Sequence, residues 1–148
     1  MPEKIASKEM VIFNLGREKF ALSTEQVRSI EEMQPIVPVP QSPEYVSGLL
    51  NLRGEIIAVI DLRKRLKLKE VTVGRDVVIV VVEHAGEAVG VVVDRVYSVE
   101  AFEAKPQAVP DGIAKTPQGG FYQSVLELPG EKIIILNLDK ILSVEEVK

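Results

Sequence analysis

Residues 52–66 read LRGEIIAVIDLRKRL, and residues 128–142, which begin 76 positions later, read LPGEKIIILNLDKIL. Seven of the fifteen aligned pairs are identical: Leu52/Leu128, Gly54/Gly130, Glu55/Glu131, Ile57/Ile133, Leu62/Leu138, Lys64/Lys140 and Leu66/Leu142. A weaker similarity at an offset of 69 aligns Glu18 with Glu87, Val27 with Val96, Ser29 with Ser98 and Glu31 with Glu100. Because both similarities run in the same order, the sequence predicts two copies of one unit of roughly 70 residues. Two such lobes would form a groove between them, where a partner can bind.

Each copy is expected to contain short strands joined by tight turns. Residues 10–15 and 20–22 form one expected strand pair, and residues 56–62 and 132–138 are strands that follow turns at Gly54 and Gly130. Residues 75–83 are expected to form a strand whose run VVIVVV is apolar on both faces, so it is either buried on both sides or covered by the other lobe. Residues 88–99 are expected to return as one strand, where Gly90 marks a bulge or a close backbone approach.

Two or three short helices are expected. Ser23 and Gln26 have the spacing of a capping box, and Val27, Ile30 and Met33 follow at helical spacing toward the core. Residues 43–50 are read as one or two helical turns, and residues 139–147 as a C-terminal helix. The prolines between 35 and 43 place residues 36–40 in extended chain near a sheet edge. Many short strands with few helices favour a mostly β fold of barrels or sandwiches.

Composition limits the function classes. The chain has 148 residues and no cysteine, so it can bury a core, and disulfides and thiolate chemistry are excluded. A net charge of −4, from 18 basic and 22 acidic residues, argues against a general nucleic-acid binder. No apolar run approaches the ~18 residues of a membrane span, and the N-terminus MPEKIASKEM lacks an apolar signal core. The sequence predicts a cytoplasmic protein without direct membrane insertion.

Residues suited to catalysis are scarce. His84 is the one histidine, so a zinc site lacks ligands and a serine triad has one available base, in an expected hairpin turn. The chain contains neither GxxxxGK[ST] nor GxGxxG, the loops that bind phosphates. Asp61 and Asp94 each end an apolar strand, where a carboxylate usually accepts from a turn or caps a helix. We therefore expect no catalytic residue, no cofactor and no metal.

Arg53 is the sharpest candidate for recognition. It lies at a tight turn between apolar stretches, where the second copy has Pro129. A guanidinium presents five donors in a rigid plane and suits a carboxylate or backbone partner. The alternative is an ordinary exposed turn arginine. The nearby residues 48–50 form either a groove wall or part of the core.

Three stretches resemble the chemotaxis coupling protein family, CheW. They are FNLGREKFALSTEQVRSIEE at 13–32, PVPQSPEYVSGLLNLRGEIIAVIDLRKRL at 38–66 and VGVVVDRVYSV at 89–99. The similarity runs from about Val11 to the end in family order, and YVSGLLNLRGEIIAVIDL is its most specific part. The resemblance implies a single domain over 1–148, built from two packed five-stranded SH3-like β-barrel lobes with short helices. The lobes would span about 9–70 and 71–148, and the N-terminal strand could pack with the second lobe.

The resemblance also implies a function. Family members are non-catalytic scaffolds that couple the cytoplasmic tips of chemoreceptors to a chemotaxis histidine autokinase. The receptor tip is a helical hairpin that lies in the groove between the lobes. The kinase regulatory domain has the same fold, so the two pair barrel to barrel and build rings under the receptor array. Similar contacts between two adaptors would give weak self-association, and partners would recruit the protein to membrane-associated arrays.

The family's site residues can be carried over by position. The receptor groove would include Val27, Gly48, Arg53, Val77 and Val99. The kinase interface would use exposed apolar barrel edges at Ile56, Ile57 and Ala58. Arg95 and Tyr97 differ from the small or apolar residues that are common there, a departure that concerns the groove and not the fold.

Other functions stay open at this point. A small-molecule-binding or enzymatic barrel domain could use the same groove between the lobes. A coupling protein of a non-flagellar, type IV pilus-like chemosensory pathway would have the same fold. An OB-like nucleic-acid binder is disfavoured by the negative net charge.

Overall fold

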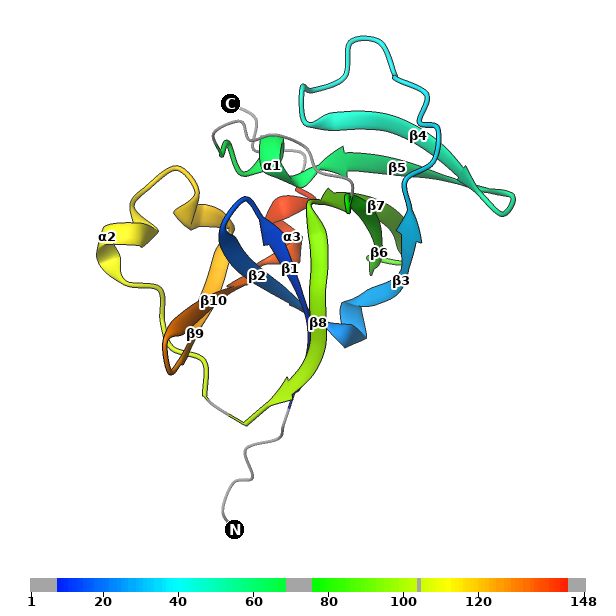
Figure 1. Ribbon diagram of the computed structural model, residues 1–148. Helices are drawn as coiled ribbons and strands as arrows, with labels where there is room; N and C mark the ends of the chain where they lie inside the picture. The colour runs from blue at the N-terminus through cyan, green and yellow to red at the C-terminus, as the bar shows by residue number, and fades with distance from the viewer. Residues whose placement is uncertain (1–7, 69–75, 104, 144–148) are drawn as a thin grey trace.

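The chain folds into two five-stranded sheets, shown as separate lobes in Figure 1. The computed structural model describes residues 8–68, 76–103 and 105–143. Sheet 1 has the order β8-β1-β2-β10-β9, and sheet 2 has the order β3-β6-β7-β5-β4. Sheet 1 contains β1 (Lys8–Leu15), β2 (Glu18–Ser23), β8 (Arg95–Phe102), β9 (Tyr122–Leu128) and β10 (Glu131–Leu136). Sheet 2 contains β3 (Val27–Glu32), β4 (Val46–Leu52), β5 (Glu55–Asp61), β6 (Val78–His84) and β7 (Glu87–Val93). The mostly β prediction with two five-stranded units is confirmed.

The helices are short. They are α1 (Leu62–Arg65), α2 (Asp111–Ala114), α3 (Leu138–Ile141) and the single 3₁₀ turns η1 (Thr24–Gln26) and η2 (Gly119–Phe121). Helix α1 follows β5 and is capped by Asp61, whose side chain accepts from two backbone N–H groups. Helix α3 follows β10 and is capped by Asn137, which stands 76 residues after Asp61. The two copies of the sequence repeat thus end in the same strand–cap–helix unit.

The internal repeat is visible in the topology. The strands β1 to β5 of the first copy correspond in order to β6 to β10 of the second. When each strand of sheet 1 is replaced by its equivalent in the other copy, the strand order becomes that of sheet 2. Each sheet also contains one parallel pair, β10 with β2 and β5 with β7. Each sheet combines the first two strands of one copy with the last three strands of the other copy. The boundaries expected at 9–70 and 71–148 therefore describe the sequence copies and not the sheets.

Short connections explain this exchange between the copies. One residue, Asp94, separates β7 from β8, which is fewer than the two residues of the tightest common hairpin. Strand β8 therefore cannot fold back beside β7 and instead pairs with β1 in the other sheet. The link from β2 to β3 is the single turn η1, which likewise leads from sheet 1 into sheet 2. The expected single strand at 88–99 is thus two strands in different sheets.

The buried apolar residues form one shared core and one small core within each sheet. Strand β6 shows the pattern, because Ile79 and Val81 pack inside sheet 2 while Val80 and Val82 pack in the core shared by both sheets. Strand β1 does the same with Ile12 and Phe13. A strand with a core on each face needs an apolar residue at every position. This confirms the expectation that VVIVVV is covered on both sides, although residue 75 of that expected strand lies outside the described residues.

The helix expected from Ser23 is wrong beyond its first turn. Ser23 does cap η1, because its Oγ accepts from the Glu25 N–H at 3.1 Å. Val27 then begins β3, which pairs with β6. The residues expected to face the core, Ile30 and Met33, are instead exposed. Pairing with a strand some 50 positions away decides this segment, and local helical spacing carries no information about such a partner.

Two other expected helices are shorter than predicted. Pro43 begins a single turn, which is closed by a hydrogen bond of 2.9 Å from the Val46 N–H to the Pro43 carbonyl. Strand β4 begins directly at Val46. Helix α3 ends at Ile141, and residues 144–147 of the expected C-terminal helix lie outside the described residues. The extended chain expected at 36–40 is confirmed by an isolated bridge between Val37 and Leu49. The close approach expected at Gly90 is also confirmed, because an added Cβ would lie 2.8 Å from Ile79 Cγ2.

Asp94 joins three segments at the crossover between the sheets. Its Oδ2 accepts from the Gly16 N–H at 2.6 Å, and its Oδ1 pairs with the guanidinium of Arg63 on α1. Both side chains are mostly buried. The expectation that Asp94 serves as a turn acceptor is confirmed.

Replacing Asp94 with asparagine should lower the free energy of unfolding by about 2 kcal/mol. The amide keeps the shape of the side chain but removes the charge from two hydrogen bonds, which are worth more when one partner is ionised. Urea unfolding measures the change, and Asp111→Asn, at an exposed carboxylate, serves as the control. Equal unfolding midpoints for Asp94→Asn and the parent chain would show that the carboxylate charge does not hold the crossover.

Candidate functional site: the edge strands and the β4–β5 turn

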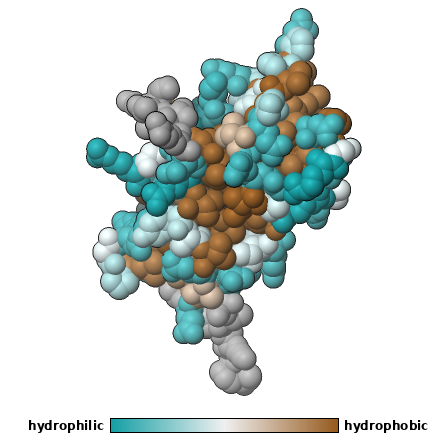
Figure 2. All heavy atoms as spheres, turned by 45° about the vertical axis from the view of Figure 1, so that its right-hand side comes forward, coloured by the Kyte–Doolittle hydropathy of each residue, from teal (hydrophilic) through white to brown (hydrophobic). Residues whose placement is uncertain are grey.

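Strands β3 and β8 are edge strands of different sheets, and both begin at a crossover between the sheets. Their exposed apolar side chains include Ile30 on β3 and Tyr97 and Val99 on β8. Figure 2 turns the side that carries β3 in Figure 1 toward the viewer and shows apolar surface gathered at the middle of this face, between polar margins. An exposed apolar patch with a polar rim is typical of a surface that binds a partner.

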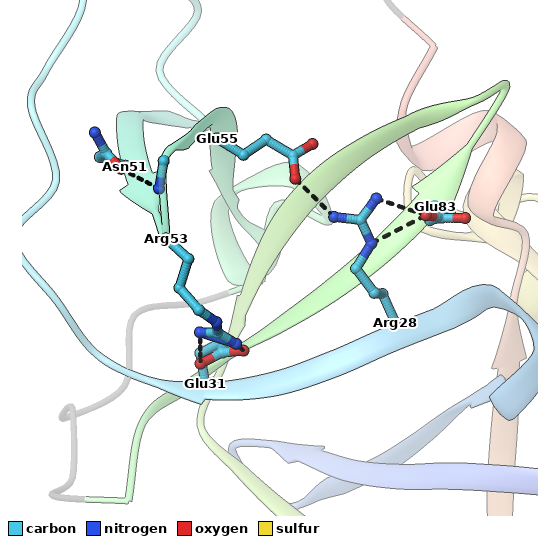
Figure 3. A network of polar contacts seen from close by, with 7 residues as sticks. Arg28, Glu31, Asn51, Arg53, Glu55 and Glu83 are labelled. Carbon is cyan, nitrogen blue, oxygen red and sulfur yellow. Dashed lines mark hydrogen bonds and ion pairs between the residues drawn. The ribbon is translucent and has the colours of Figure 1, made fainter.

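A ladder of ion pairs joins β3 to the turn between β4 and β5 (Figure 3). Arg53 Nη2 lies 2.8 Å from Glu31 Oε2, and Arg28 Nη1 lies 2.9 Å from Glu55 Oε1. Arg28 also reaches Glu83 on β6, with Nη2 2.6 Å from Oε2. Strands β3 and β4 are the two edges of sheet 2, so these side chains link its edges where no backbone ladder does. Charged side chains on an edge also discourage pairing with other chains.

The ion pairs of the ladder affect the pKa of Arg28 and occupy some of the donors of Arg53. The hydrogen bonds that Arg28 donates to the carboxylates of Glu83 and Glu55 raise the pKa of its guanidinium above the ordinary value. The Arg53 side chain is 68% exposed, whereas that of Glu31 is 14% exposed. Arg53 uses two N–H donors on Glu31 and has five in all, so donors on its open side can meet a partner. Its carboxylate partner already holds the guanidinium in place.

The turn that carries Arg53 has a strained backbone of the kind expected from NLRGE. Arg53 has φ of 50° and Gly54 has φ of 93°, and the Asn51 Oδ1 accepts from the Gly54 N–H at 2.9 Å. Two successive residues with positive φ match the right-handed twist of a hairpin, a geometry that asparagine and glycine favour. The turn thereby presents the Arg53 side chain from the end of the hairpin toward β3.

The structure brings some of the predicted groove residues together. Arg53 contacts Glu31 near the end of β3, and Val77 directly precedes Val78, which pairs with Glu32 at that same end. Val27 lies at the other end of β3, about 17 Å from Glu32 along six residues of extended chain. Its side chain is partly buried against the shared core. Val99 is 48% exposed on β8, in the other sheet. The exposed members of the predicted groove are therefore Arg53 and Val99.

Gly48 is buried, and its role in the structure is local. Its φ is 143°, and an added Cβ would lie 2.1 Å from the Val37 carbonyl oxygen. The glycine lets the extended segment at Val37 approach β4 and form two backbone hydrogen bonds with Leu49, of 2.9 and 2.8 Å. Gly48 thus shapes the surface next to Arg53 without being exposed on it.

The predicted kinase residues divide between two faces of β5. Ile56 is 60% exposed and Ala58 is also exposed, but Ile57 is 3% exposed within the core of sheet 2. Successive strand residues point to opposite faces, and one face of β5 is covered by the core of sheet 2, so three consecutive positions here cannot all be exposed. The expectation that Ile57 contributes an exposed edge is corrected here. Leu49, opposite Ala58 on β4, extends the exposed apolar surface.

The residues that depart from the family pattern line a shallow hollow. Arg95 and Tyr97 from sheet 1 lie around it with Asp76, which precedes β6 of sheet 2, and its volume is about 290 Å³. Lys19 Nζ lies 3.8 Å from the centre of the Tyr97 ring and 2.9 Å from Glu131 Oε1. The hydrogen bond to Glu131 raises the pKa of Lys19. The substituted positions thus line a hollow between the sheets.

Sequence reasoning missed the partners of Arg53. Glu31 and Arg28 fell within the expected helix, where their order relative to Arg53 and Glu55 has no meaning. Read as a strand, the segment places Arg28 and Glu31 against Glu55 and Arg53 in antiparallel order with opposite charges. That complementarity was the available signal, and it needed the correct secondary structure.

The one histidine, the candidate catalytic base of the sequence, lies at the end of a strand. His84 ends β6 and is partly buried, and its Nδ1 lies 3.3 Å from Asp139 Oδ1. Within residues 8–68, 76–103 and 105–143, no group of three His, Cys, Asp or Glu side chains is arranged to hold a metal ion. Across the same described ranges, no helix has the length and apolar character needed to cross a membrane.

Comparison with known proteins identifies relatives of this chain and of its fold. The model of the CheW-like domain matches residues 9–146. The chain is 31% identical over 140 residues to the chemotaxis protein CheW of Rhizobium meliloti, covering 94% of this chain and 90% of that protein. It is 35% identical over 109 residues to CheW of Bacillus subtilis, covering 73% and 70%. The crystal structure of the scaffolding protein TtCheW from Thermoanaerobacter tengcongensis superposes with a TM-score of 0.86 at 30% identity, covering 95% of each chain. A family model that spans nearly all of the chain, together with these relatives, shows that the chain belongs to the CheW-like family.

Proposed function

We propose that this chain couples the cytoplasmic tips of chemoreceptors to a chemotaxis histidine autokinase and carries out no catalysis itself. Membership of the CheW-like family makes it a scaffold protein of chemotaxis. The observation that carries the proposal is the match over residues 9–146, which includes both sheets and the NLRG turn. This match favours a scaffold over a small-molecule-binding barrel.

The receptor tip, a helical hairpin, would lie along the edge strands β3 and β8. Exposed apolar side chains on both strands suit the apolar stripe of an amphipathic helix. Arg53 lies at one end of β3 with donors on its open side and would bind a carboxylate or a helix carbonyl of the receptor. Val27 and Val77 would support this surface from the two ends of β3, and Gly48 would shape it from within the sheet.

The kinase regulatory domain would bind the outer surface of the β4–β5 hairpin. Ile56 and Ala58 are exposed on β5, and Leu49 lies opposite Ala58. Burial of these apolar side chains against a partner would favour association. The kinase domain would recruit the chain, with the receptors, to arrays at the membrane.

Calorimetric titration tests the kinase contact. The chain is titrated with the regulatory domain of a chemotaxis histidine kinase from the same genome, and we expect saturable one-to-one binding. Ile56→Asp should weaken this binding by about tenfold or more, because it places a charge in an apolar contact. Ile113→Asp, the same change at an exposed apolar residue on α2, should leave the affinity unchanged.

The outcomes separate the parts of the proposal. Binding that Ile56→Asp and Ile113→Asp leave equally intact would move the kinase contact away from the β4–β5 hairpin. No binding by the folded parent chain would contradict the coupling role with this kinase.

A further inference from the structure

Arg65 is the one charged residue of the described chain that is buried, at 5% exposure. It ends α1, which follows β5 of sheet 2. An ionised group is costly to remove from water unless hydrogen bonds replace its hydration. Arg65 therefore needs partners that replace its hydration at this position.

The guanidinium lies between equivalent residues of the two sequence copies. Its central carbon is 4.3 Å from the ring centre of Tyr45 and 4.9 Å from that of Phe121. Tyr45 and Phe121 are 76 positions apart, the offset of the repeat. Their carbonyls accept from equivalent N–H groups as well, those of Asp61 and Asn137, both at 2.8 Å. The two copies are related by approximate symmetry, and Arg65 lies where equivalent residues of the two copies come together.

The hydrogen bonds of Arg65 break that symmetry. Its Nε donates to the Ile141 carbonyl at 2.7 Å, and its Nη2 donates to the carbonyls of Lys140 and Ser143 at 3.1 and 2.8 Å. These carbonyls lie at the C-terminal end of α3, where a helix leaves its last acceptors without intrahelical donors. The residue equivalent to Arg65 in the second copy is Ile141, whose side chain packs in the shared core. One side chain of the first copy therefore holds the last turn of the second.

The core shared by the two lobes is apolar, and other polar contacts join the lobes in addition to those of Arg65, among them Asp94 with Gly16 and Arg63, and His84 with Asp139. The shared core combines residues of sheet 1, such as Phe13 and Phe20, with residues of sheet 2, such as Val80 and Val91. Apolar burial is non-directional, so it favours contact between the lobes without specifying one angle between them. A planar guanidinium with fixed donor directions does specify an angle, because the carbonyls of Lys140, Ile141 and Ser143 must lie in set positions to accept from it.

We propose that Arg65 is a positioning residue that sets the relative orientation of the two lobes and, through it, the spacing of the edge strands β3 and β8. The receptor-binding consequence rests on the proposed function, in which the receptor hairpin lies along these two strands. Arg65 itself would contact no receptor, since it is buried on α1. Its effect would be transmitted through α1 and β5 on one side and through α3 and β10 on the other.

The spacing can be measured without any partner. The chain has no cysteine, so Glu32→Cys on β3 and Ala101→Cys on β8, both exposed, allow two spin labels to be attached for pulsed electron–electron distance measurement. We expect one narrow distance distribution in the parent chain and a shifted or broadened one in Arg65→Met. Arg65→Lys, which keeps the charge but not the planar fork, should give an intermediate distribution. Lys64→Met, the same change at the exposed neighbour on α1, should match the parent.

Binding of the receptor hairpin gives the second readout. Arg65→Met should weaken it by at least about fivefold, in the usual range for coupling between separate sites. Kinase-domain binding at Ile56 should be unchanged, because that surface lies within one lobe. If Arg65→Met lowers the melting temperature but leaves the distances unchanged, Arg65 is a stabilising residue only and the proposal is wrong. If Arg65→Met does not fold, Arg65→Lys decides by the same distances.

The two proposals can fail separately. If the parent chain binds no receptor hairpin, the proposed function is wrong, and the spin-label distances still decide whether Arg65 orients the lobes. If the hairpin binds the parent chain and Arg65→Met equally well, the coupling to the receptor surface is refuted.

Discussion

Gly48→Ala should lower the free energy of unfolding by roughly 4 kcal/mol, a large part of the stability of a domain of this size. Gly48 has φ of 143°, a conformation that costs a residue with a side chain about 1–3 kcal/mol. An alanine Cβ would also lie 2.1 Å from the Val37 carbonyl oxygen, which belongs to the backbone and not to a flexible side chain. The segment at Val37 must therefore move away from β4.

That movement gives the second part of the cost. It breaks the two backbone hydrogen bonds between Val37 and Leu49, each worth about 1 kcal/mol. Urea unfolding followed by circular dichroism measures the sum. Gly120→Ala is the matched control, because an added Cβ there has no neighbour within 4 Å, and we expect a change below about 0.5 kcal/mol. If the two variants unfold at the same urea concentration, Gly48 is not required for the approach of the two segments.

The hairpins of this fold could be predicted from the sequence because their signals are local. The turns at Gly54 and Gly130, the apolar strands after them and the carboxylate that ends β5 all occur within about fifteen residues of the repeat. The same local signal identified Arg53 as a turn residue with its side chain available. Turn geometry and capping depend on neighbours in sequence, so they can be read there.

The assignment of strands to sheets could not be read in this way. Whether β8 pairs with β7 or with β1 depends on the single residue Asp94 and on contacts with Gly16 and Arg63, which are distant in sequence. The helix expected after Ser23 failed for a related reason, because β3 is defined by its pairing with β6. The partners of Arg53 depended on that pairing too, so the ion-pair ladder was hidden from sequence analysis.

Arg53→Glu should weaken binding of the receptor hairpin by about 30-fold or more and reduce kinase activation in a reconstituted array. The substitution removes the exposed donors that would meet the receptor and replaces them with a carboxylate beside Glu31. Loss of a charge-assisted contact with added like-charge repulsion commonly costs 2 kcal/mol or more, which corresponds to about 30-fold. The fold should remain stable, because Arg53 itself is exposed and an ion pair with one exposed partner contributes only about 1 kcal/mol. Arg17→Glu, at an exposed arginine in the β1–β2 turn, is the control for the change in net charge.

A charge exchange distinguishes the two ways in which Arg53 could act. In the double variant Arg53→Glu with Glu31→Arg, the ion pair between the turn and β3 can form again with its charges reversed. If receptor binding stays weak in the double variant, the receptor contacts the Arg53 side chain directly, and Arg53 belongs to the receptor groove. If binding recovers, the ion pair matters because it holds the hairpin against β3, and Arg53 positions the surface without contacting the receptor. If Arg53→Glu alone leaves both binding and kinase activation intact, neither role holds, and the receptor surface must be sought away from the β4–β5 turn.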